Sequence, residues 1–275
     1  MGRRAKSSTR ESRTPGNSGN AGSTPARLSA VASPTLRGDR RWPAIDFFRG
    51  CAIVAMVIYH FCFDLAYNGW LVADFARDLR WIWFRIPILG SFLFIAGVSL
   101  GLAPVRGQTR SQFWRRVAII AAAAALVSLG SYLMFPESFI WFGVLHAIAL
   151  MSVLARPALR WGGWLIGAGL AVLAIGASVQ LPFFDQPALR WIGLMTFKPR
   201  TEDYVPLFPW FGMLLIGAGA GAWTAAHQRW SERVAAWSAP LPLRWLGWLG
   251  RHSLAVYLLH QPLMMGAMLL LRRFM

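Results

Sequence analysis

Long stretches of apolar residues follow one another along the chain, separated by short polar or basic connections. Most approach the roughly 20 residues that an α-helix needs to cross a bilayer. We therefore predict an all-α, polytopic integral membrane helix bundle with about seven transmembrane helices. The predicted spans are 44–67, 80–103, 117–135, 139–155, 161–180, 206–226 and 251–271. An eighth membrane element within 181–205 or 235–250 stays open, with 191–197 as a candidate interfacial segment.

The first 40 residues have a different composition from the rest, since Ser, Arg, Gly, Pro and Thr predominate. Such a segment buries too little apolar surface to order itself, so we predict a disordered, basic cytosolic tail rather than a cleaved signal peptide. Weak contact of this tail with anionic lipid is the alternative. Residues 41–275 then form the transmembrane domain. The basic, Trp-rich connector 227–250 is expected to lie partly on the membrane surface.

Composition and charge agree with a membrane protein. Hydrophobic residues make up 56% of the chain and charged residues 14%, while the formal net charge is +17. Nucleic acid is not the expected partner, because the basic residues are concentrated in the tail and in connections between spans, such as the predicted loop 104–116. Most of them fall on one side if the N-terminus is cytosolic, which predicts that orientation. The two cysteines, Cys51 and Cys62, have no metal-binding spacing, and no metal site is expected.

The first span carries four ionisable residues, which are costly in hydrocarbon and therefore mark candidate functional positions. Asp46, Arg49, His60 and Asp64 fall on one stripe of the predicted helix. Asp46 and Arg49 are spaced to pair, with Arg49 near the cytosolic surface; an interfacial ion pair of no functional role is the alternative. His60 lies about 16 Å further along the axis. Asp64, one turn later, is placed to accept a ring N–H from His60, although a buried structural histidine is the competing interpretation.

The last span repeats this vertical arrangement. Arg251 lies near the cytosolic surface, and Ser253, Tyr257 and His260 share one face of the helix by their spacing. Two helices that each combine a cationic entrance with a deep histidine suggest a passage that admits an anionic molecule from the cytosol.

Two further segments interrupt apolar sequence with reactive groups. His146 lies within the fourth span, in the segment FGVLHAIAL, where a structural histidine is the alternative to a catalytic one. Asp203 and Tyr204 precede the sixth span in DYVPLFPWFG. That composition suits a polar-substrate site, and it is equally ordinary at a membrane boundary.

These motifs resemble a known family. Asp46-Phe47-Phe48-Arg49-Gly50 followed by His60 is similar to the D-x-x-R-G…H signature of membrane acyltransferases that acylate sugars. Together with FGVLHAIAL, DYVPLFPWFG and GRHSLAVYLLHQP, it resembles the bacterial relatives of heparan-α-glucosaminide N-acetyltransferase, over roughly residues 42–272. The lysosomal enzyme has asparagine where this chain has His60, and its lumenal N-terminal domain has no counterpart here, so heparan is not the expected acceptor.

The resemblance implies a membrane-bound acetyltransferase of the bacterial inner membrane that moves an acetyl group from cytosolic acetyl-CoA to a sugar or amino-sugar acceptor. His60 is the expected base, with Asp64, His146 and His260 as further catalytic candidates. The expected binding residues are Asp46, Arg49, Asp203, Tyr204, Arg251, Ser253 and Tyr257. Membrane lipids and a homodimer partner are also expected.

Two other functions stay open: a transporter or flippase for an anionic or sugar-linked substrate, and a membrane interaction protein whose histidines are structural. N- versus O-acetylation, and an acetyl-histidine intermediate versus direct transfer, also stay open.

Overall fold

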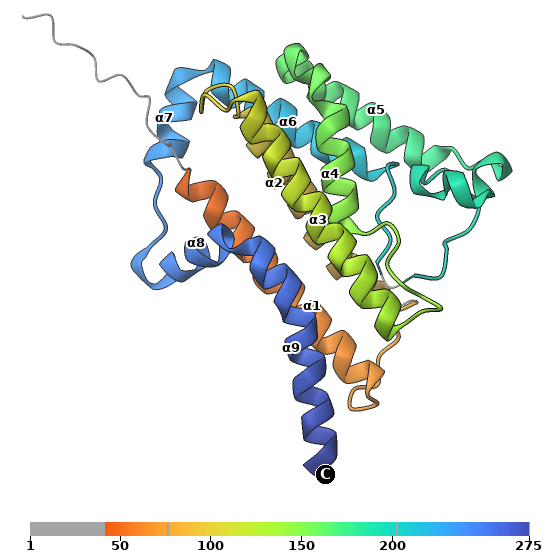
Figure 1. Ribbon diagram of the computed structural model, residues 1–275. Helices are drawn as coiled ribbons and strands as arrows, with labels where there is room; N and C mark the ends of the chain where they lie inside the picture. The colour runs from red at the N-terminus through yellow and green to blue at the C-terminus, as the bar shows by residue number, and fades with distance from the viewer. Residues whose placement is uncertain (1–41, 76, 202, 275) are drawn as a thin grey trace, which may run out of the picture. The chain divides into compact units, whose positions relative to one another are not determined.

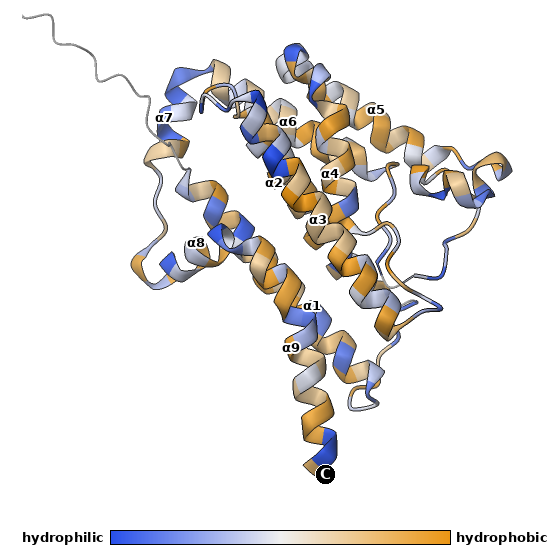
Figure 2. Cartoon of the chain, viewed as in Figure 1, coloured by the Kyte–Doolittle hydropathy of each residue, from blue (hydrophilic) through white to orange (hydrophobic). Residues whose placement is uncertain are grey.

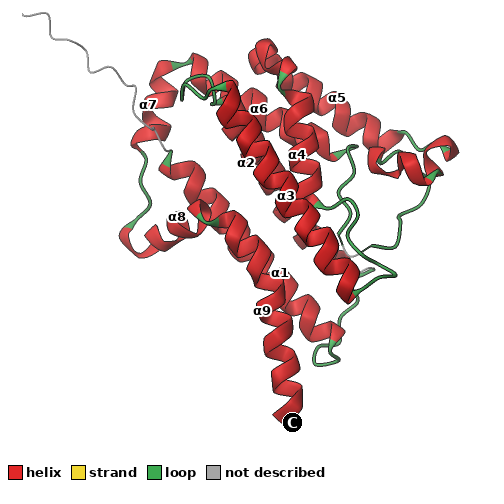
Figure 3. Cartoon of the chain, viewed as in Figure 1, coloured by secondary structure: helices red, strands yellow, loops and turns green. Residues whose placement is uncertain are grey.

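The computed structural model describes residues 42–75, 77–201 and 203–274, and these residues are helical with irregular connections and no named strand. The predicted basic tail lies outside the described residues. Figures 1 and 3 show the helices and their connections. The α-helices are α1 (Pro43–Tyr67), α2 (Leu79–Gly101), α3 (Arg110–Met134), α4 (Val144–Ala155), α5 (Leu165–Ser178), α6 (Trp210–Ala226), α7 (Gln228–Ala236), α8 (Arg244–Arg251) and α9 (Ser253–Phe274). The 3₁₀ segments are η1 (Pro157–Trp164), η2 (Pro182–Asp185), η3 (Pro187–Ile192) and η4 (Leu241–Leu243).

The predicted all-α, polytopic membrane architecture is confirmed. Among the described residues, five helical segments are long and apolar enough to cross a membrane, and α4 and α6 are shorter apolar helices. The five are Pro43–Tyr67, Leu79–Gly101, Arg110–Met134, Pro157–Ser178 and Ser253–Phe274. Their large apolar residues are widely exposed, among them Leu133 at 74% and Leu263 at 67%, as expected where lipid is the solvent. Figure 2 shows this apolar character along the long helices and the hydrophilic character of α7.

The predicted fourth span is shorter than expected. Residues 139–143 are not helical, and α4 contains 12 residues, which rise about 18 Å. A hydrocarbon core of about 30 Å exceeds that length, so α4 alone does not cross it. The sixth span likewise begins late, at Trp210, because Pro206 and Pro209 precede it.

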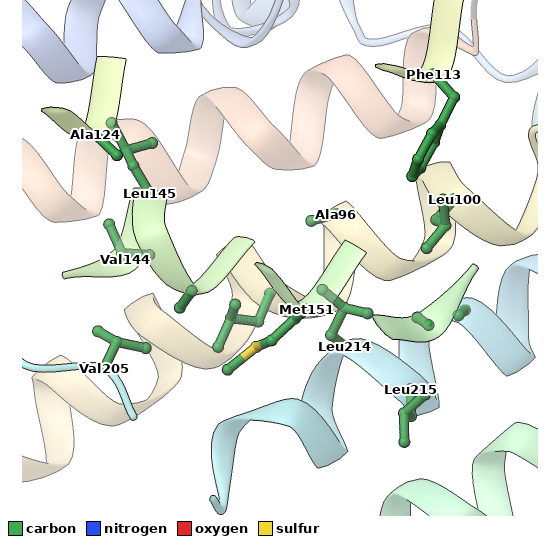
Figure 4. Close-up of a cluster of buried hydrophobic side chains, with 14 of the residues drawn as sticks. Ala96, Leu100, Phe113, Ala124, Val144, Leu145, Met151, Val205, Leu214 and Leu215 are labelled. Carbon is green, nitrogen blue, oxygen red and sulfur yellow. The ribbon is translucent and has the colours of Figure 1, made fainter. Parts of the chain in front are cut away.

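A core between α2, α4 and α6 holds the bundle together. Leu93, Met151 and Leu214 are fully buried in it, and Figure 4 shows Met151 and Leu214 meeting there. Small residues bring α2 and α6 close together. A Cβ on Gly97 would strike the carbonyl oxygen of Leu214, and one on Gly217 would strike that of Phe94. Such contacts are a usual basis of helix association in lipid.

The connector predicted to lie on the membrane surface is largely helical, and its second helix packs on the first span. A Cβ added to Gly50 of α1 would strike the carbonyl oxygen of Leu246 in α8, and one on Gly250 would strike that of Asp46. The backbones of α1 and α8 are therefore in contact. Trp237, just after α7, packs edge-on against Phe47, with the ring centroids 5.1 Å apart. The connector thus holds the beginning of α1, where Asp46 and Arg49 lie.

Candidate active site

A basic cavity of about 630 Å³ lies among α1, α2, α3, α4 and α9. Four arginines line it: Arg49, Arg106, Arg115 and Arg116. Ser99 and Gln112 add hydroxyl and amide groups. Guanidinium groups bind phosphate through several N–H donors at once, so this lining fits a phosphorylated ligand.

Arg49 is held in place by two contacts. Its Nη1 lies 3.1 Å from Asp46 Oδ1, which is the ion pair that the i,i+3 spacing predicts, and its Nη2 donates to Ser99 Oγ at 3.1 Å. Ser99 comes from α2, so this bond joins two helices. Sequence reasoning missed Ser99, since a serine in an apolar span gives no signal of its partner.

Arg115 and Arg116 belong to a helix and not to the predicted loop 104–116. Helix α3 begins at Arg110 because Thr109 accepts from the Gln112 backbone N–H and the Gln112 side chain accepts from the Thr109 N–H, which is a capping box. The second half of the predicted loop is therefore the first two turns of α3. Arg251, the predicted counterpart of Arg49, is exposed at the end of α8 and does not line the cavity.

Ser253 and Tyr257 of α9 do line the cavity, and Tyr257 is tied to a distant segment. The Tyr257 hydroxyl donates to the carboxylate of Asp203. Asp203 Oδ2 also accepts the Val144 N–H at 2.8 Å, at the beginning of α4. Desolvation raises the pKa of Asp203 above its usual range, against the opposing effect of its hydrogen bonds. Asp203 thereby positions both Tyr257 and α4.

Tyr204 has a different role from Asp203. Its hydroxyl donates to the backbone carbonyl of Arg190, and burial raises the pKa of Tyr204. Tyr204 is not among the residues that line the basic cavity. Its hydrogen bond to Arg190 joins two parts of the loop between α5 and α6.

His60 and His260 come together one turn beyond Tyr257, with their ring centroids 5.1 Å apart. His260 Nδ1 lies 2.7 Å from the Tyr257 carbonyl oxygen. A carbonyl only accepts, so Nδ1 carries the proton and Nε2 keeps a lone pair. That Nε2 is buried and has no hydrogen-bond partner among the described residues. The arrangement leaves a basic nitrogen available beside His60.

Asp64 is bound differently from the prediction. Its carboxylate is buried, at 1% exposure, and Oδ1 accepts from Gln261 Nε2 of α9 at 2.8 Å. No hydrogen bond joins Asp64 to His60 among the described residues. Asp64 Oδ2 and Gln261 Oε1 are buried without a partner there. With His260 Nε2 they make three buried polar atoms whose desolvation only a further polar group would offset.

His146 is engaged in local structure. Its Nδ1 accepts the Gly143 N–H at 3.2 Å, so the proton resides on Nε2, which faces Ser128 Oγ at 3.2 Å. Ser128 in turn donates to the Ile140 carbonyl. Nδ1 thus caps the N-terminus of α4, and Nε2 joins it to α3. The neighbours Val144 and Leu145 line the basic cavity, whereas His146 does not.

The described residues contain no group of three or more His, Cys, Asp or Glu side chains placed to hold a metal ion.

A family model described as "Heparan-alpha-glucosaminide N-acetyltransferase, catalytic" matches residues 41–262. The chain belongs to this family. The match confirms the resemblance drawn from the motifs and identifies the chain as a membrane acetyltransferase. It includes every residue of the basic cavity and the His60–His260 pair. Neither the comparison with characterised proteins nor that with solved structures found a match.

Proposed function

We propose that this acetyltransferase takes its acetyl group from cytosolic acetyl-CoA and transfers it to a sugar or amino-sugar acceptor. The observation that carries the proposal is the arrangement along α1 and α9. Both helices contribute to an arginine-lined cavity, through Arg49 on α1 and Tyr257 on α9, and both carry a histidine further along. The two histidines meet each other.

The donor half of the proposal rests on charge. Coenzyme A carries three phosphate groups, and four arginines with one paired carboxylate at Asp46 present a cationic surface to them. The uncharged pantetheine arm then follows α9 past Ser253 and Tyr257. From Arg49 to His60 the rise is about 16 Å, which an extended arm spans. The acetyl thioester is thereby brought to the histidine pair.

The chemical step needs a base for the acceptor and a donor for the oxyanion. His260 Nε2 has the lone pair to take a proton from an acceptor hydroxyl as it attacks, or from an acceptor ammonium before the resulting amine attacks. The acceptor oxygen or nitrogen bonds to the acetyl carbon, and collapse of the tetrahedral intermediate breaks the C–S bond and releases the CoA thiolate. Ser253 lines the cavity and is the candidate to stabilise the oxyanion, because the one Tyr257 hydroxyl proton is donated to Asp203. His60, beside His260, can receive or return a proton.

In this proposal the remaining candidate residues do not contact the substrates but hold other parts of the site in position. Asp64 holds Gln261 and therefore the turn of α9 that carries His260. His146 and Asp203 fix the beginning of α4, which forms one wall of the cavity. The positive-inside distribution supports a cytosolic position for the arginines, and we propose the inner membrane of a bacterium as the location.

Purified protein in nanodiscs, supplied with acetyl-CoA and glucosamine, tests the proposal by release of free CoA thiol and formation of acetylated sugar. We expect both products in equal amounts, with acetyl-CoA required. His252→Ala is the control, because His252 is exposed and its Nδ1 bonds the Trp248 carbonyl outside the cavity. In sealed proteoliposomes of the same protein, movement of sugar across the membrane without acetyl-CoA, and with no acetylated product, would instead establish a transporter.

A further inference from the structure

A second cavity, of about 520 Å³, lies between α1 and α2 on a different face of α1 from the arginines. Apolar side chains form almost all of its lining, including Ile45, Ala55, Ile88 and Ile95. At its rim, Phe48 and Pro87 are exposed. We name it the α1–α2 groove. Both helices are of membrane-spanning length, so its natural occupant is a hydrocarbon chain and not a polar ligand.

Helix α7 lies at the end of the groove where α1 begins and α2 ends. Val234 of α7 packs against the cluster that contains Ile45 and Ile95, which both line the groove. Trp237, just after α7, stacks on Phe48 of the rim, with the ring centroids 6.2 Å apart and the planes at 17°. The groove therefore opens next to a short amphipathic helix.

The exposed face of α7 is cationic and aromatic. Arg229 and Arg233 are exposed and one turn apart, and the Arg233 guanidinium lies 5.2 Å from the Trp230 ring centroid. Glu232 is the acidic residue of this helix, and it accepts from Gln228 at 2.8 Å. Trp beside Arg is the combination that favours the headgroup region of a bilayer. Two arginines one turn apart suit the phosphate of a phospholipid headgroup whose net charge is negative.

We propose that the α1–α2 groove and α7 together form a site for one anionic phospholipid. One acyl chain lies in the groove, and the phosphate is bound by Arg229 and Arg233. The apolar groove fits any phospholipid tail, whereas the two arginines select the anionic headgroup. The lipid site shares α1 with the basic cavity but contains none of the arginines that line that cavity.

Native mass spectrometry of the purified full chain tests this, with phosphatidylglycerol and phosphatidylcholine of identical acyl chains as probes. We expect one phosphatidylglycerol bound per chain, and a rise in melting temperature with that lipid. In Arg229→Gln/Arg233→Gln the affinity for phosphatidylglycerol should fall by about thirtyfold, the effect of two cations at an anionic surface. Ala55→Phe, which fills the groove, should weaken the binding of both lipids. These readouts do not depend on acetyl transfer.

The matched control is Arg77→Gln/Arg200→Gln. It removes two exposed arginines that lie beyond the other ends of the spans. This variant should bind phosphatidylglycerol as the unmodified chain does. Equal affinity for the two lipids, or an equal loss in both arginine variants, would overturn the headgroup site. Unchanged lipid binding in a folded Ala55→Phe protein would overturn the groove.

Discussion

Replacing Arg49 with glutamine should weaken the binding of acetyl-CoA far more than the binding of acetyl-pantetheine. Arg49 lines the basic cavity, and its guanidinium is oriented by Asp46 and Ser99 at 3.1 Å each. Glutamine keeps a hydrogen-bond donor for those partners but removes the charge. The substitution therefore isolates the contribution of the guanidinium to phosphate binding.

The magnitude follows from the charged hydrogen bond that the guanidinium would donate to phosphate. A hydrogen bond to a charged group contributes about 1.5–3 kcal/mol net. The remaining arginines, Arg106, Arg115 and Arg116, still attract the phosphates, so we take the lower half of that range. This corresponds to a rise in KM for acetyl-CoA of about 10–50-fold. Acetyl-pantetheine has no phosphate, and its KM should change by less than about threefold.

The assay is steady-state release of free thiol with each donor, at fixed acceptor concentration. Arg110→Gln is the matched control, since Arg110 is exposed at the beginning of α3 and does not line the cavity. Equal loss with both donors in Arg49→Gln would show that Arg49 supports the fold and not the phosphates. An unchanged KM for acetyl-CoA would refute the placement of the nucleotide.

Three further predictions concern the scaffold and are read by thermal unfolding in detergent. Gly250→Ala should lower the free energy of unfolding by about 1–3 kcal/mol, because the added methyl group meets the backbone of α1. Gly266→Ala is the control, since the space around Gly266 is open. His146→Ala should lose about 0.5–2 kcal/mol, since it removes the cap of α4, and the folded fraction should keep its KM for acetyl-CoA. Asp203 has a raised pKa in the folded state, so the native protein binds the extra proton. The protonated Asp203 therefore contributes to the free energy of unfolding. This contribution is complete below the pKa of Asp203 in the unfolded chain, about 4, and is lost as the pH rises through the higher pKa of Asp203 in the folded protein. Asp203→Asn should therefore remove that decline in stability, and a decline that persists would contradict this assignment.

Local spacing was sufficient for part of the architecture. The apolar stretches predict where the long helices lie, since the length of a span is set by the bilayer. The Asp46–Arg49 ion pair follows from i,i+3 geometry within one helix. The face shared by Ser253 and Tyr257 follows from the same geometry, and both residues line one cavity.

Contacts between distant segments were beyond such reasoning. The beginning of α4 depends on Asp203, 59 residues away, which accepts the Val144 N–H. Asp64 is bound by Gln261, 197 residues away, and not by its neighbour His60. Arg251 has the spacing of a cavity residue but lies on α8, because the chain turns between α8 and α9. Periodicity describes one helix and gives no information on which helix it will meet.

The central claim is that the His60–His260 pair performs acetyl transfer at the end of the acetyl-CoA cavity. Its most direct test is to measure, in the same preparations, acetyl-CoA affinity by calorimetry and single-turnover transfer to glucosamine for His60→Ala, His260→Ala and the His252→Ala control. We predict that all three bind acetyl-CoA within about threefold of the unmodified chain. Transfer should fall at least about a hundredfold in the first two variants alone, the scale of general-base catalysis. Full transfer by both His60→Ala and His260→Ala would contradict the account.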